Sequence, residues 1–163
     1  MVEAAHTIIL GDYLGYAKAS SYFFRSLLVF SCIMGASCGA LVAVIDDDAA
    51  VCEAISSLLR SASYRCATFD SAEVFLASGP ASEIDCILLN ISMSRMSGLD
   101  LHLALTRMMH PAPVIYVTAT HDGGLRERAL SQGAAAFLSK TFEDEQLLDA
   151  IHLVLKSSGR DRA

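Results

Sequence analysis

The feature that most constrains the fold is a series of short, uninterrupted apolar runs that alternate with helical patterns after residue 40. The first run, Leu41–Ile45, is rich in β-branched residues, which is typical of a strand buried on both faces. After it, Val51, Ile55 and Leu59 recur at the spacing of an amphipathic helix. Strands buried on both faces belong to parallel sheets that are covered by crossover helices, so this alternation predicts an α/β domain.

The same pattern continues to the end of the chain and predicts where each element lies. Strands are expected at Leu41–Ile45, Tyr64–Phe69, Cys86–Leu89, Val114–Val117 and Ala134–Leu138. Helices are expected around Val51–Leu59, from Ser71 to a stop at Gly79 and Pro80, and at Gly98–Met109, Gly123–Gln132 and Glu143–Lys156. Gly133 is expected to be the residue that ends its helix, because glycine adopts the left-handed conformation without strain.

Residues 1–40 differ in composition from the rest of the chain. They carry two acids and two bases, so the net charge of −6 belongs to the residues that follow. This negative charge argues against electrostatic binding of nucleic acid, because it would not neutralise phosphates. The stretch Ser26–Ile45 has no charge and is long enough to cross a bilayer. Its last residues are needed for the first strand, however, and the shorter remainder is interrupted by Ser, Gly and Cys, which argues against a membrane span.

We therefore expect three segments. Residues 1–40 are a leader that is disordered or extraneous, 41–157 are the folded domain, and 158–163 are a tail. A natural start at Met34 would explain the leader, and an ordered accessory helix or a membrane anchor are the alternatives.

Polar side chains follow four of the predicted strands. Asp46 and Asp47 follow the first strand, Asn90 the third, Thr118 the fourth and Lys140 the fifth. The carboxyl ends of parallel strands meet at one edge of the sheet, where ligands bind. Carboxylates are ligands for Mg²⁺, and a lysine and a hydroxyl hold anionic oxygens. Any one of these residues could simply mark the point where the chain leaves the core, but the set predicts a site for Mg²⁺ and a phosphoryl group.

The motifs around these residues resemble the response-regulator receiver domain of two-component systems. They are Val44-Ile-Asp46-Asp47-Asp48, Leu88-Leu-Asn90-Ile-Ser-Met93, Met96-Ser-Gly98, Val117-Thr118-Ala and Phe137-Leu-Ser-Lys140. The resemblance covers about 41–156 and is nearest to receivers of nitrogen-fixation-type and nitrate-type transcription regulators. It implies a flavodoxin-like, doubly wound α/β fold with a five-stranded parallel sheet in the order 2-1-3-4-5 and helices on both faces.

The resemblance also implies a role for each site residue. Asp46 and Asp47 fall where the family holds Mg²⁺. Thr118 falls where a hydroxyl binds the phosphoryl group and moves inward on activation. Lys140 falls where a lysine contacts the phosphoryl oxygens, and Phe137 falls where an aromatic side chain turns together with the threonine.

Asn90 departs from the family at the position of the phosphoacceptor. Active receivers carry an aspartate there, whose carboxylate is both the nucleophile and a metal ligand. The amide of asparagine is uncharged, and the lone pair of its nitrogen is delocalised, so it cannot form the acyl phosphate. The sequence therefore predicts a pseudo-receiver in which Asn90 also weakens the Mg²⁺ site.

Two more positions differ from the family near the site. Ser94 stands where a proline usually follows the methionine, and Thr141 replaces a proline that usually follows the lysine through a cis bond. A cis bond before a residue other than proline costs about 2.5–4 kcal/mol. We therefore expect a trans bond after Lys140, which would redirect the lysine.

The sequence is interpreted as a cytoplasmic single-domain receiver of a phosphorelay, not an enzyme, that acts by protein–protein interaction as a decoy or adaptor. Its expected partners are a histidine kinase, a phosphotransfer protein, another receiver, or a second copy bound through the fourth helix, fifth strand and fifth helix. Arg126 and Arg128 on the fourth helix could serve this contact, although a solvated helix face explains them more simply. A membrane or nucleic acid is not expected as a partner.

Two alternative functions remain open at this stage. One is a truncated transcription regulator that has lost its DNA-binding domain. The other is a Mg²⁺-dependent phosphatase of the haloacid-dehalogenase type, for which Asp46 and Asp48 would supply the paired carboxylates. Ala50 counts against the phosphatase, because Thr or Val should stand there.

The cysteines and histidines do not have the spacing of a metal site. Cys66 and Cys86 fall on predicted strands and are expected to be buried, reduced thiols. The histidines are expected in solvent or at helix ends.

Overall fold

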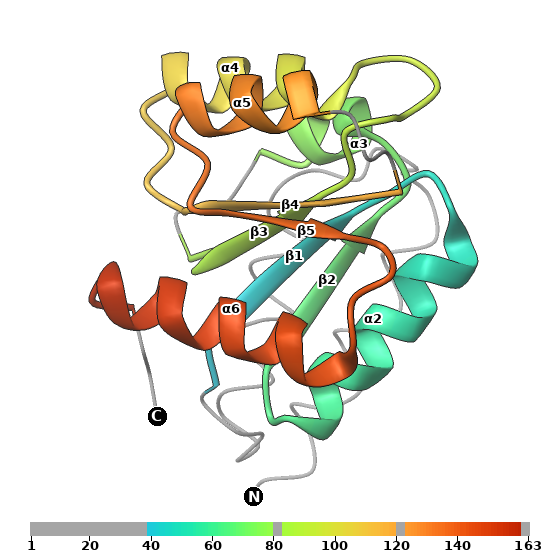
Figure 1. The fold of residues 1–163 in the computed structure, drawn as a ribbon, viewed down its shortest axis with the longest axis vertical. Helices are drawn as coiled ribbons and strands as arrows, with labels where there is room; N and C mark the ends of the chain where they lie inside the picture. Colours follow the sequence, from blue (N-terminus) through green and yellow to red (C-terminus); the bar gives the residue numbers. More distant parts are fainter. Residues whose placement is uncertain (1–38, 80–82, 120–122, 161–163) are drawn as a thin grey trace, which may run out of the picture.

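The computed structural model describes residues 39–79, 83–119 and 123–160. The strands are β1 (Leu41–Ile45), β2 (Arg65–Phe69), β3 (Cys86–Leu89), β4 (Val114–Thr118) and β5 (Ala136–Ser139). The helices are α2 (Ala49–Ser61), α3 (Ala72–Ala77), α4 (Gly98–Arg107), α5 (Gly123–Ser131) and α6 (Asp144–Ser157). Strands and helices alternate as the sequence predicts (Figure 1). The predictions for the leader and the end of the tail fall on residues 1–38 and 161–163, outside the described residues.

The five strands form one parallel sheet in the order β2-β1-β3-β4-β5, which confirms the predicted flavodoxin-like topology. From the interior strand β1, the chain moves outward to β2 and then returns to β3 on the other side of β1. The order of the strands therefore reverses at β1 and β3. In an open α/β sheet, this reversal leaves a crevice at the carboxyl ends of the two strands, where ligands bind.

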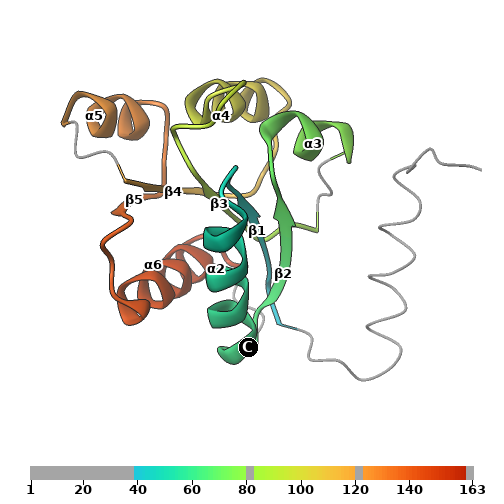
Figure 2. The ribbon, with the colours of Figure 1, turned by 90° about the vertical axis from the view of Figure 1, so that its right-hand side faces the viewer.

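The sheet is buried between two layers of helices. Helices α2 and α6 cover one face, and α3, α4 and α5 cover the other (Figures 1 and 2). Along β1, Leu41 and Ile45 point into the cluster under α3 and α4, whereas Val42 and Val44 point into the cluster under α2 and α6. Because both faces of β1 are covered, every position of the strand is apolar.

Local signals set the ends of the helices. Helix α2 begins after Asp48, whose Oδ1 accepts a hydrogen bond from the backbone N–H of Ala50 at 2.9 Å. Helix α5 closes at Gly133, which has a φ of +89° as predicted, and the N–H of Ala134 then bonds to the carbonyl of Ala129 at 3.1 Å. The chain is still completing the end of this helix at Ala134, so β5 begins two residues later than predicted.

Helix α4 also ends earlier than predicted. It stops at Arg107, and Met109 adopts a left-handed φ of +52° that closes the helix. Glycine or asparagine usually occupies such a position, so a methionine there does not mark the end of a helix.

The last five residues of the uncharged stretch, Leu41–Ile45, form a strand of the sheet. They are the buried interior strand β1, as their β-branched composition predicts. Among the residues that the structure describes, no helix is long and apolar enough to cross a membrane.

Candidate functional site

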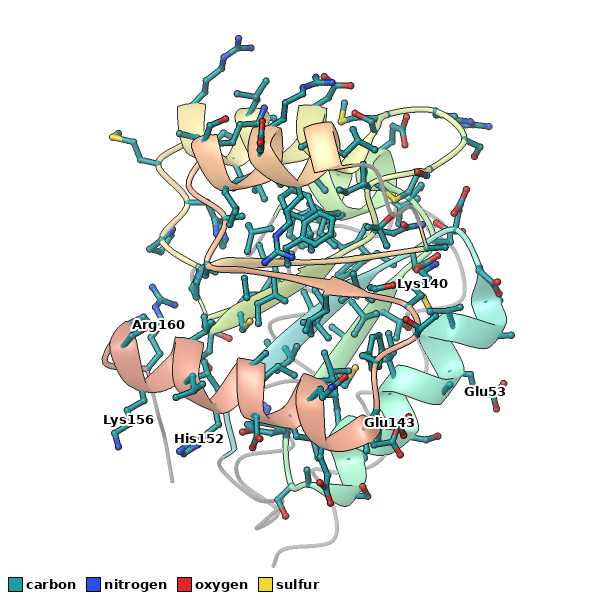
Figure 3. The ribbon with its side chains drawn as sticks, viewed as in Figure 1. Glu53, Lys140, Glu143, His152, Lys156 and Arg160 are labelled. Carbon is teal, nitrogen blue, oxygen red and sulfur yellow. The ribbon has the colours of Figure 1, made fainter. Side chains whose placement is uncertain are left out.

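The polar residues that follow β1, β3 and β5 come together at the carboxyl edge of the sheet. Asp46 is 3% exposed and lies between Asn90 and Lys140. Figure 3 shows Lys140 at the end of β5, on the side of the sheet where α2 begins. The predicted convergence of these three residues is therefore present in the structure.

Both carboxylate oxygens of Asp46 have partners in the protein. Oδ2 forms an ion pair with Nζ of Lys140 at 2.7 Å. Oδ1 accepts hydrogen bonds from Nδ2 of Asn90 at 3.2 Å and from the backbone N–H of Asp48 at 3.0 Å. The backbone carbonyl of Asp46 accepts a further bond from Sγ of Cys52. Asp46 therefore connects β1 with the ends of β3 and β5.

The amide of Asn90 is suited to this environment. The side chain is buried, and its Nδ2 donates to Asp46 and to the backbone carbonyl of Ser92 at 3.0 Å. A carboxylate at this position would have no proton for either bond and would place a second negative charge beside Asp46.

Lys140 reaches Asp46 although Thr141 follows it. The peptide bond between the two residues is trans, as expected. Its Nζ contacts Asp46, so the lysine reaches the acidic residue that follows β1. The expected change in its direction relative to the lysine of the family stays a prediction. Oγ of Ser139 lies 3.1 Å from Oγ1 of Thr141, and this hydroxyl pair joins the two sides of Lys140.

Asp47 is exposed, and its partner comes from the loop that follows β3. Its Oδ2 accepts a hydrogen bond from the backbone N–H of Ser94 at 3.0 Å. A proline at position 94 would have no N–H for this bond. Ser94 therefore supplies a backbone donor to the acidic site.

The residues present do not fit a Mg²⁺ ion well. The ion needs near-octahedral oxygen ligands and keeps several waters. Here both oxygens of Asp46 and one oxygen of Asp47 already accept bonds from the protein. Across the described part of the chain, there is no group of three or more His, Cys, Asp or Glu side chains that could hold a metal.

The two residues assigned to switching lie on neighbouring strands. Thr118 is fully buried at the end of β4, and its carbonyl accepts a bond from the N–H of Lys140 at 2.8 Å. The ring of Phe137 on β5 is half-buried, 6.5 Å from the ring of Tyr116. The guanidinium of Arg126 lies 5.8 Å from the centre of the Phe137 ring, so this exposed arginine also covers an aromatic side chain.

Gly98 starts α4 against the backbone of Asn90. A Cβ atom at Gly98 would lie 2.1 Å from the carbonyl oxygen of Asn90, which is closer than real atoms approach. The N–H of Gly98 bonds to the carbonyl of Ile91 at 2.9 Å. A glycine is therefore required to bring α4 this close to the backbone of Asn90.

A buried polar pair, His102 on α4 and Tyr116 on β4, was not predicted from the sequence. Contrary to the expectation of solvent or a helix end, His102 is buried within α4, and its Nδ1 lies 3.0 Å from the hydroxyl of Tyr116. That hydroxyl also donates to the carbonyl of Gly98 at 3.4 Å. Burial lowers the pKa of His102 and raises the pKa of Tyr116. The apolar pattern of α4 does not predict this pair, because the pair depends on which residue of β4 lies beneath the helix.

The thiols of Cys52, Cys66 and Cys86 are free, as predicted for the latter two. Cys86 is buried, whereas Cys66 is half-buried rather than buried. Burial raises the pKa of Cys66 to about 11 and that of Cys86 to about 12, so these thiols are protonated and unreactive at neutral pH.

Two hollows flank the site. A cleft of about 540 Å³ runs between α2 and the end of β2 and is lined in part by Asp46, Asp47 and Asp70. A smaller groove of about 190 Å³ separates α2 from the connection between β5 and α6. Its walls are Val51, Ala54, Ile55, Leu58, Lys140, Phe142 and Asp144.

Comparison with known proteins identifies the family. The family model of the response regulator receiver domain matches residues 42–152, from β1 into α6. The chain therefore belongs to the response regulator receiver family, a class of two-component signalling domains.

Individual relatives agree with this assignment. The response regulator protein TodT of Pseudomonas putida is 37% identical over 123 residues, which are 76% of this chain and 54% of TodT. The structure of the response regulator StyR has a TM-score of 0.68 and 38% identity, over 74% of this chain and 61% of that one. A receiver protein from Burkholderia phymatum has a TM-score of 0.64 and 37% identity, over 72% of this chain and 95% of that one. The chain spans about half the length of the curated relatives it matches.

Membership in this family supports a role in phosphorelay signalling. Receiver domains are generally non-enzymatic, bind Mg²⁺ at an acidic phosphorylation site and interact with histidine kinases and phosphotransfer proteins. One relative is named transcriptional regulatory protein FixJ, so the sequence-based expectation that nucleic acid is not a partner has no support from the relatives.

Proposed function

We propose that this chain is a receiver that acts by protein–protein interaction without being phosphorylated. The observation that carries the proposal is the Asn90 amide, which donates to Asp46 at the position where receivers carry the phosphoacceptor. Phosphotransfer needs a nucleophilic oxygen at this point, and the amide has none of comparable strength. Lys140 is engaged by Asp46, which also supports the proposal.

Acetyl phosphate with Mg²⁺ tests the proposal. We expect that intact-mass spectrometry finds no phosphoryl adduct on the full chain. The matched control is Asn90→Asp, which restores the carboxylate. If the control is phosphorylated and the parent is not, Asn90 alone blocks the reaction. If the control also fails, Ser94 and Thr141 have disabled the site as well. A stable adduct that maps to Asn90, or to an aspartate formed from it, would refute the proposal.

The groove between α2 and α6 is the surface we assign to a kinase, a phosphotransfer protein or another receiver. Its walls are mainly apolar, with Lys140 and Asp144 at the polar end, and it opens beside the acidic site. A helix of the partner could place apolar side chains on Leu58 and Phe142. We expect Leu58→Glu to abolish binding to such a partner, whereas Ser61→Glu at the exposed end of α2 leaves it intact. Equal binding by both variants would exclude this groove.

A second copy of the chain is the other partner we propose, through α5, β5 and α6. Leu130 on α5 and Leu153 on α6 are 47% and 63% exposed and are the apolar side chains that we assign to this contact. Arg126 and Arg128 on α5 could pair with acids of the second copy. Sedimentation of the parent and of Leu153→Arg tests this contact, and a parent that is monomeric at high concentration would rule it out.

The receiver part of a transcription regulator is the second candidate function. It is favoured by the coverage of the relatives, since the chain matches about half of each, and by names such as FixJ. In this case, 41–157 is the part of the regulator that receives the signal. We do not propose the phosphatase alternative, because the chain belongs to the receiver family. Either signalling role takes place in the cytoplasm, with the kinase and its partners.

A further inference from the structure

The two carboxylates of the site are held by donors that belong to the chain. Asp46 accepts from Asn90, from the backbone of Asp48 and from Lys140. Asp47 accepts from the backbone N–H of Ser94. These contacts join the end of β1 to the loop after β3 and to the end of β5.

The two departures from the usual receiver pattern around β3 each add a donor. Asn90 brings an N–H group where a carboxylate would bring only acceptors. Ser94 brings a backbone N–H where a proline would bring none. Both donors face the acids, at 3.2 Å from Asp46 and 3.0 Å from Asp47. Asn90 and Ser94 therefore both add a hydrogen-bond donor to a carboxylate of the site.

The charges follow the same pattern. The ammonium of Lys140 balances Asp46, and Asn90 is neutral, so only Asp47 is left without a cationic partner among these four side chains. A divalent ion that used Oδ2 of Asp46 would compete with Lys140, and one that used Oδ2 of Asp47 would compete with the N–H of Ser94. It would recover fewer anionic ligands than Mg²⁺ usually requires.

We propose that Asn90 and Ser94 replace the metal of the acidic site, so that the loop from Ile91 to Ser97 keeps its position without Mg²⁺. Ser94 is a positioning residue in this arrangement, because its N–H fixes Asp47 and the loop relative to each other. The loop also contains Met96, whose N–H donates to Oε1 of Glu73 on α3 at 3.2 Å, so it is attached at two points. The inference rests on these contacts and not on whether the chain takes phosphate.

Amide hydrogen exchange of the full chain, followed by NMR, tests the proposal. We expect the Ser94 amide to be protected, and the protection to be unchanged when EDTA or millimolar Mg²⁺ is added. Asp47→Ala should remove this protection. Asp47→Asn should keep it, because the amide retains an acceptor oxygen of the same geometry. This comparison separates the specific bond from a general effect on folding, since both variants remove the charge.

Two results would overturn the proposal. One is a Ser94 amide that exchanges equally fast in the parent and in Asp47→Ala. The other is a Mg²⁺-induced shift or loss of protection at Ser94 in the parent, which would show that the ion competes for Asp47.

Ser94→Pro, with Ser94→Ala as its control, gives a second measurement. In the Asn90→Asp background, we expect the proline variant to bind Mg²⁺ several-fold more tightly than the alanine variant, because only proline frees Asp47. Equal affinities would contradict the role of the N–H.

Discussion

Restoring the carboxylate at position 90 should make the folded protein less stable in the absence of Mg²⁺. Nδ2 of Asn90 lies 3.2 Å from Oδ1 of Asp46, so Asn90→Asp places two carboxylate oxygens at about this separation. At an effective dielectric constant of about 20, two unit charges at this distance repel by about 5 kcal/mol. Lys140 offsets part of this repulsion, because it lies 2.7 Å from Asp46 and would be attracted by both carboxylates. We expect a net loss of about 1–3 kcal/mol in the free energy of unfolding at neutral pH.

The loss should be reversed by Mg²⁺ and by acid. A ligand that binds only the folded state at ten times its Kd adds about 1.4 kcal/mol. Mg²⁺ should therefore recover much of the stability of Asn90→Asp and leave the parent unchanged. Repulsion raises the pKa of one carboxyl of the pair in the folded state, so its penalty applies above that pKa and fades as the pH falls.

Urea unfolding of both proteins at pH 7 and pH 5, with EDTA or with Mg²⁺, measures these effects. Asn90→Ser is the control, because it removes the amide without adding a charge. Our account of the site would be refuted by an Asn90→Asp variant as stable as the parent in EDTA. A parent that gains as much from Mg²⁺ as the variant would refute it equally.

Three further predictions concern α4 and the turn that follows it. Gly98→Ala should lower the free energy of unfolding by more than about 2 kcal/mol, because the new Cβ would meet the carbonyl of Asn90, and urea unfolding measures it. Met109→Gly should raise the free energy of unfolding by about 0.5–1 kcal/mol, because Met109 has a left-handed φ of +52°. The thermal midpoint should rise with it, and an unchanged midpoint would contradict the strain at Met109. Burial lowers the pKa of His102 below its ordinary 6.5, so the unfolded chain takes up a proton first and stability falls as the pH drops below about 6.5. His102→Gln should flatten this part of the pH profile, and an unaltered slope would count against it.

The residues that determine the fold are mostly local in sequence. The apolar run Leu41–Ile45 can be buried on both faces only in a covered parallel sheet, and it is β1. The boundaries of α4 and β5 were less predictable, because the turns at Met109 and Ala134 depend on which carbonyls are left free at the end of a helix.

The candidate site shows the same division. The order of polar residues after the strands was sufficient to predict that Asp46, Asn90 and Lys140 lie together, because parallel strands end at one edge. Their bonds could not be read from the order. The backbone N–H of Ser94 reaches Asp47 only because the loop after β3 folds back across β1, and the sequence shows Ser94 only as a departure from the family.

Periodicity alone predicts a covered parallel sheet, and side-chain chemistry alone shows that position 90 carries an uncharged amide, since neither depends on distant contacts. The partners of Asp46 and Asp47 and the burial of His102 against Tyr116 follow from the tertiary structure. Hydrogen bonds need separations of about 3 Å between groups that are far apart in the chain, and packing of the helices on the sheet sets those separations.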